Sequence, residues 1–212
     1  MTKAKMVIGT LTAVLALGVA AVSATSAAAA GWMVGGTELS GSAAISKTTI
    51  MDEGFKLEAA SVHVSITCTG LQVEGGKLTA PNKDSASSLE FTGCKGNSHC
   101  PLEQTTIKSA AILSEATLEG ALAANITFKP ETGKDFANVT FGEGEECSLA
   151  GTQPVAGEVK ALAPTGRDER TLQLITPNAT EASGELKVGS AGASLKGSAL
   201  LGLESHKTWS LL

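Results

Sequence analysis

The segment SLEFTGCKGNSHCP, from Ser88 to Pro101, contains two of the four cysteines of the chain. These are Cys94 and Cys100, and the other two, Cys68 and Cys147, lie on either side of the segment. In an exported protein, four cysteines are most simply two disulfides, each contributing about 2–4 kcal/mol. We favour the pairs Cys68–Cys94 and Cys100–Cys147, and the spacing leaves open a local Cys94–Cys100 loop combined with Cys68–Cys147.

The first 30 residues have the three-part layout of a secretory signal peptide. Two lysines precede an apolar run from Met6 to about Val22, and the small-residue stretch SATSAAAA follows. The run of about 17 residues is short for a membrane span, and the alanines offer a signal peptidase the small side chains it needs. We therefore expect a signal peptide at 1–30 and a mature domain at 31–212, with an uncleaved N-terminal anchor as the alternative.

Charge and hydropathy restrict the partners of the mature chain. The full chain has a net charge of −5, and losing Lys3 and Lys5 with the leader leaves 14 basic against 21 acidic residues. An acidic surface repels nucleic acid and anionic membranes. No later stretch approaches the roughly 18 consecutive apolar residues of a membrane helix, so we expect no membrane span after the leader.

The mature chain alternates apolar and polar residues with period two, in short runs separated by Gly or Pro. The clearest run is SVHVSITC, which would direct Cys68 toward the core and His63 toward the polar face. Such runs recur every 8–12 residues or so, which is typical of an antiparallel β-sandwich or barrel. Tyrosine is absent and aromatic residues make up 3 % of the chain, which predicts a light core of Val, Ile, Leu and Ala. We expect a single all-β domain.

Three segments depart from this pattern. Asp52-Glu53-Gly54 has the composition of a turn and should separate two strands, and PNKDSASS, from Pro81 to Ser88, is predicted to be a polar loop. The region from Leu102 to Leu122 favours strands, with a short helix as the alternative. The stretches that begin at Cys68 and Cys147 share a Gly-containing turn and a strand ending in Ala-Pro, so duplication of a β unit competes with coincidence.

The order of several short motifs resembles a large group of secreted, Ala/Gly-rich proteins predicted from actinobacterial genomes. These motifs are GWMVGG, SITC, LEFTGC with a second cysteine nearby, and a C-terminal strand ending in KTWSLL. The resemblance covers most of the mature chain. It implies an exported, β-rich protein, and it brings no catalytic residues.

Nothing in the residue pattern indicates catalysis. The chain has no G-x-S-x-G motif, and its three histidines, His63, His99 and His206, are scattered, which favours surface positions. A hydrolase would need two of these histidines, or a histidine and the acidic Glu143–Glu146 loop, to meet in one cleft. We therefore predict no catalytic residues and no enzymatic activity.

Metal binding is also not expected. Zinc ligation by Cys94, His99 and Cys100 is disfavoured because C-x(5)-C is not a two-plus-two ligand set and exported thiols form disulfides. The Glu143–Glu146 loop lacks the spacing of a calcium loop, so a solvated acidic turn is the simpler interpretation. We predict no metal and no cofactor.

These features favour a secreted, non-enzymatic protein with a structural or binding role at or outside the cell envelope. Its sheet edges could pair with an envelope partner or with a second copy. One alternative is a β-barrel that binds a small apolar molecule, which predicts an apolar cavity. The other alternative is a secreted hydrolase that uses carboxylates or a histidine.

Overall fold

A computed structural model describes residues 30–119, 123–144, 146–165, 170–183 and 185–212. All of the predicted leader except Ala30 lies outside these residues. The described chain is all-β, and its only helical elements are two short 3₁₀ turns, η1 (Ala60–Val62) and η2 (Glu181–Ser183). The region from Leu102 onward forms strands, which confirms the strand prediction over the helix there.

Eight antiparallel strands close into a barrel, which confirms the predicted fold class. Going round the barrel, the order is β3, β6, β7, β11, β12, β15, β16 and β19, and β19 then pairs with β3. Their bounds are β3 Ser42–Ala59, β6 Lys77–Thr79, β7 Lys83–Ala86, β11 Ile112–Glu119, β12 Ala123–Pro130, β15 Val159–Pro164, β16 Leu172–Pro177 and β19 Ser194–Leu203.

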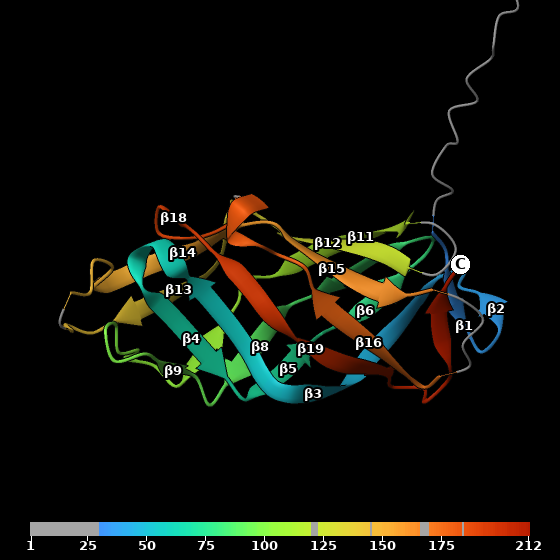
Figure 1. Ribbon diagram of the computed structural model, residues 1–212. Coiled ribbons are helices and arrows are strands. Elements are labelled where there is room, and N and C mark those ends of the chain that lie inside the picture. Colours follow the sequence, from blue (N-terminus) through green and yellow to red (C-terminus); the bar gives the residue numbers. More distant parts are fainter. Residues whose placement is uncertain (1–29, 120–122, 145, 166–169, 184) are drawn as a thin grey trace, which may run out of the picture.

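The remaining strands extend or cover the barrel. Beyond the barrel, β3 also pairs with β4 (Val64–Cys68), and β4 pairs with β9 (Lys95–Gly96). There are three smaller sheets. The first consists of β5 (Gly70–Glu74), β8 (Ser88–Thr92) and β10 (Thr106–Lys108), and the second of β13 (Asp135–Phe141), β14 (Gly151–Gly157), β17 (Leu186–Val188) and β18 (Ala191–Gly192). The third consists of β1 (Trp32–Val34), β2 (Thr37–Glu38) and β20 (Trp209–Leu211). Figure 1 shows an elongated molecule with β1 and β2 at one end and β4, β9, β13 and β14 at the other.

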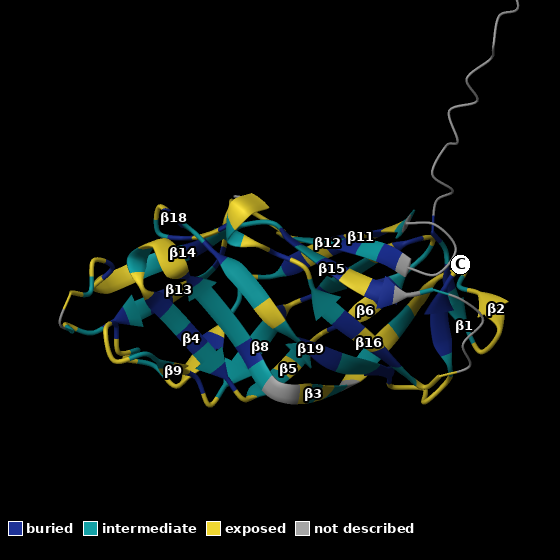
Figure 2. Ribbon diagram, in the orientation of Figure 1, coloured by how far each residue is buried: buried dark blue, intermediate teal, exposed yellow. Residues whose placement is uncertain are grey.

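Two tryptophans fill the barrel at the end covered by the β1–β2–β20 sheet. Trp32 and Trp209 are buried, with their ring centroids 5.7 Å apart. The indole of Trp32 donates a hydrogen bond to the carbonyl of Lys83 (2.8 Å), and that of Trp209 donates to the carbonyl of Leu201 (3.3 Å). These two residues anchor one of two buried clusters, and the other cluster lies between the barrel and the outer sheets. Figure 2 shows buried residues along β11, along β19 and along the C-terminal strand β20, whose three residues are all buried.

The predicted turn at Asp52-Glu53-Gly54 is wrong, because β3 runs through it without a break. Gly54 has a φ of +99° and Gly197, on β19, has a φ of +125°. A Cβ atom on Gly197 would lie 2.6 Å from the carbonyl oxygen of Gly54, so the two backbones meet where the β3–β19 register shifts. The turn-like composition therefore marks a bend within one long strand.

Two other local predictions are also corrected. The predicted polar loop from Pro81 to Ser88 contains the barrel strand β7, because the pairing partners on β6 and β11 supply the apolar residues that this segment lacks. His63 does not lie on a strand: it follows η1 in a left-handed conformation with φ 54°, and β4 begins after it. The position of Cys68 is as predicted, since it is buried on β4.

We predict that Gly197→Ala destabilises the protein by about 2–4 kcal/mol, because the added methyl group would overlap the Gly54 backbone at a φ that side chains avoid. Gly133→Ala is the matched control, since Gly133 also has a positive φ (+73°) but has open space around its Cβ position. Urea unfolding should show the larger loss for Gly197→Ala. Equal losses of stability in the two variants would mean that the close approach of β3 and β19 does not add to the cost of the Gly197→Ala substitution.

Candidate ligand-binding cavity

A cavity of about 170 Å³ lies between the barrel and the outer sheets. Apart from Ser109, its lining consists of apolar side chains and Cys68 of a disulfide. Four of the five phenylalanines of the chain contribute, namely Phe55, Phe91, Phe128 and Phe136. Among the residues that the structure describes, no His, Asp, Glu, Lys or Arg lines the cavity. Such a site can hold an apolar molecule but offers no group for acid–base chemistry.

The strand period of two brings these residues to the cavity. On β12 and β15, Phe128 pairs with Val159, and Ala161 lies two residues farther along β15, so all three side chains face the cavity. Ile175 of β16 and Ala199 of β19 pair in the same way farther round the wall. The small side chains at Ala161 and Ala199 leave space that larger residues would fill.

An aromatic pair forms the opposite wall. Phe55 of β3 and Phe91 of β8 have ring centroids 5.6 Å apart with their planes at 80°, the edge-to-face arrangement that aromatic rings prefer. Phe55 is buried, whereas Phe91 is only partly buried. The cavity is therefore bounded on both sides by aliphatic side chains and aromatic rings, with Phe55 and Phe128 coming from the barrel and Phe91 and Phe136 from the outer sheets.

A carboxyl group faces the barrel interior on β7. Asp84 pairs in register with Leu78 of β6 and with Ser114 of β11, both of which are buried, so it points inward. The Ser114 hydroxyl donates a hydrogen bond to the Asp84 carboxylate. Burial raises the pKa of Asp84 to about 6, and the hydrogen bond from Ser114 opposes this shift only in part. Sequence reasoning missed this group because it had assigned β7 to a loop.

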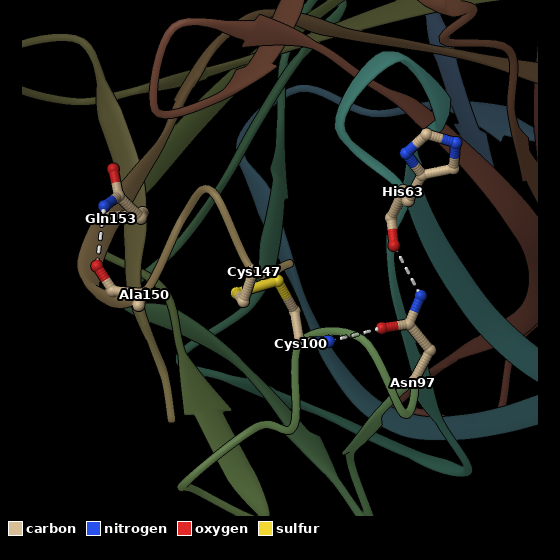
Figure 3. The surroundings of a disulfide bond; sticks show 6 residues. All are labelled: His63, Asn97, Cys100, Cys147, Ala150 and Gln153. Atoms are coloured by element: carbon tan, nitrogen blue, oxygen red, sulfur yellow. Dashed lines mark hydrogen bonds between the residues drawn. A yellow bond between two sulfur atoms is a disulfide. The ribbon is translucent and has the colours of Figure 1, made fainter. Parts of the chain in front are cut away.

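The structure confirms the favoured disulfides, Cys68–Cys94 and Cys100–Cys147. Cys68 is part of the cavity wall, so the first bridge ties β4 to the end of β8 there. Figure 3 shows the second bridge, beside which Asn97 accepts a hydrogen bond from the backbone N–H of Cys100 (2.9 Å) and donates one to the carbonyl of His63 (2.6 Å). Both bridges stabilise the half of the molecule that contains the cavity.

The histidines and the acidic loop lie outside the cavity. His63 and His99 have ring centroids 6.3 Å apart, and the backbone of Gly144 in the Glu143–Glu146 loop packs against that of His99. His206 lies in the turn between β19 and β20. Glu145 is outside the described residues. Among those described, no three His, Cys, Asp or Glu side chains are close enough together to hold a metal ion.

In the part of the chain that the structure describes, no helix is both long and apolar enough to cross a membrane. Comparison with known proteins places no further constraint on the site: no family model, no curated protein and no solved structure matches this chain. The interpretation of the site therefore depends on its own geometry.

We predict that replacing both cysteines of one bridge by alanine lowers the free energy of unfolding by several kcal/mol. The bridges span 26 and 47 residues. Loop-closure entropy then gives about 3.5 kcal/mol for Cys68–Cys94 and about 4 kcal/mol for Cys100–Cys147. Denaturant unfolding of the two double variants would measure these losses. A loss below about 1 kcal/mol for both would show that the bridges are not needed to hold the fold.

We predict that Asp84 makes the protein less stable as the pH rises. The pKa of Asp84 is about 6 in the folded state, against an ordinary 3.8 in the unfolded chain. Between these pH values the folded state binds more protons than the unfolded state, so the free energy of unfolding falls as the pH rises through this window. Asp84→Asn should therefore be more stable than the parent at pH 7.5, by up to about 3 kcal/mol, and the difference should shrink toward pH 4. Urea unfolding at several pH values measures it. Glu115→Gln on the outer face is the control, and a gain that does not vary with pH would contradict the prediction.

Proposed function

We propose that this protein is an exported β-barrel that binds a small apolar molecule in the cavity and catalyses no reaction. The observation that carries the proposal is a cavity of about 170 Å³ with an apolar lining. Engineered apolar cavities of about 150 Å³ stay dry and take up benzene or xenon, so this cavity suits a ligand with a single ring or a short chain. Eight-stranded barrels commonly enclose one small ligand.

Export is supported by two independent features. The first 30 residues have the layout of a signal peptide, and all four cysteines are joined in disulfides, which persist in oxidising compartments. A protein outside the cell that holds a small apolar molecule would act as a carrier or a scavenger. The described residues of the cavity lining include no ionisable group, which supports binding without catalysis.

We predict that ethylbenzene binds to the protein saturably, with a dissociation constant of about 0.1–1 mM, which corresponds to about 4–5.5 kcal/mol. Binding to the folded state alone should raise the midpoint of thermal unfolding as the ligand concentration increases. Titration calorimetry and thermal unfolding in sealed cells would measure both effects.

The matched variant is Ala161→Leu, which adds volume to a residue of the lining that is only 1 % exposed. It should weaken ethylbenzene binding at least tenfold, whereas Ala60→Leu, at an exposed position in η1, should leave it unchanged. If ethylbenzene does not bind to the parent protein, or binds equally well to Ala161→Leu, the cavity is not a binding site.

A further inference from the structure

Asp84 is the exception among the charged side chains of its part of the barrel. On the neighbouring strands, Lys77 of β6, Glu115 of β11 and Lys129 of β12 lie at exposed, outward-facing positions, as does Lys83 of β7 itself. Asp84 points inward, and Ser114 is the only side chain that hydrogen-bonds to it in the described parts of the chain. No cation among the described residues therefore neutralises this carboxylate inside the barrel.

The carboxylate lies at the same level as the cavity. Inward-facing residues pair in register across four adjacent strands, in the order Asp84, Ser114, Phe128, Val159. Phe128 and Val159 line the cavity, whereas Asp84 and Ser114 continue the same row just beyond the lining. Adjacent strands are about 4.8 Å apart, and side chains from all walls of an eight-stranded barrel meet near its axis. Along the wall, Ser114 alone lies between Asp84 and the lining residue Phe128, a separation of two strand spacings or about 10 Å.

The position of Asp84 is held rigidly. On one side of β7, the Asn82 side chain is buried and donates a hydrogen bond to the carbonyl of Ala116 (2.9 Å), and the backbone N–H of Ala116 donates to the carbonyl of Asn82 (2.9 Å). The Trp32 indole holds the carbonyl of Lys83. A preorganised carboxylate with no countercharge, next to an apolar cavity, is a binding point for a cation.

We propose that Asp84, assisted by Ser114, binds the ammonium group of a small apolar amine whose hydrocarbon part occupies the cavity. This inference rests on the proposed function, since it adds a polar contact to the same site. The Asp84 carboxylate accepts a charge-assisted hydrogen bond from the ammonium group, while the Ser114 hydroxyl continues to donate to the carboxylate. The simplest ligand of this kind is an apolar ring that carries its ammonium group on a one-carbon arm.

Benzylamine and ethylbenzene are a matched pair of probes, because they have nearly the same shape and differ by an ammonium group in place of a methyl group. Each would be titrated by calorimetry into the parent protein, Asp84→Asn and Glu115→Gln. Asp84→Asn preserves the shape of the side chain and its hydrogen bond with Ser114, and removes only the charge. Glu115→Gln removes an exposed carboxylate from the outer face of the adjacent strand.

The expected result is that Asp84→Asn weakens benzylamine binding ten- to a hundredfold and changes ethylbenzene binding less than threefold, while Glu115→Gln alters neither. Benzylamine binding to the parent should also weaken as the pH falls below about 6, where Asp84 takes up a proton. Ethylbenzene binding should not change over that range. In a carbon NMR titration of the carboxyl groups, benzylamine should lower the pKa of Asp84.

The two proposals can fail separately. If ethylbenzene binds but benzylamine does not, or if benzylamine binds equally well to Asp84→Asn, the amine inference is wrong and the apolar cavity remains a binding site. If neither probe binds to the parent protein, the proposed function fails and the inference fails with it. An unchanged pKa of Asp84 in the presence of saturating benzylamine would also overturn the inference.

Discussion

The pairing of β3 with β19 is the interaction on which the rest of the structure depends. It closes the barrel, because β19 is the last of the eight strands that follow one another round the wall from β3. β3 also pairs with β6 at its start and with β4 at its end, so a single strand of 18 residues joins the barrel to the outer layer. Among the paired residues of β3 and β19, the two closest in sequence, Glu58 and Ser194, are 136 residues apart. Closing the barrel therefore has a high cost in chain entropy.

The cavity follows from how this closure is combined with a light core. The barrel end near β1 is filled by two tryptophans, but the other end is walled by aliphatic side chains and phenylalanine rings from both layers, with only alanine at positions 161 and 199 of the barrel wall. Side chains of this size do not reach across the space between the two layers, so a void remains. The side chains around a void lose van der Waals contacts, which lowers the stability of the fold. Both disulfides lie in the half of the molecule that contains the void, where they offset part of this loss of stability.

The fold class could be predicted from the sequence because alternation is visible wherever one face of a strand is apolar. The run SVHVSITC, for example, forms β4 with Val64, Ile66 and Cys68 buried. The signal failed at β7, where Lys83 to Ala86 carries no large apolar residue and pairing with β6 and β11 decides the structure. It also failed at Gly54, because a bend and a turn have the same local composition. The cavity itself could not be predicted, since it depends on which walls face each other.

The failure at β7 and the charge inside the barrel have the same cause. A strand that faces a barrel interior would be most stable with an apolar residue at each inward position, and a buried carboxylate without a countercharge costs stability. Asp84 makes β7 resemble a loop in the sequence and makes the barrel less stable at neutral pH. Ser114 offsets only part of that cost, because one hydrogen bond does not replace the hydration that the carboxylate loses. A cation brought by a ligand would supply the missing interaction, so the carboxylate that destabilises the barrel wall is also suited to selecting what the cavity holds.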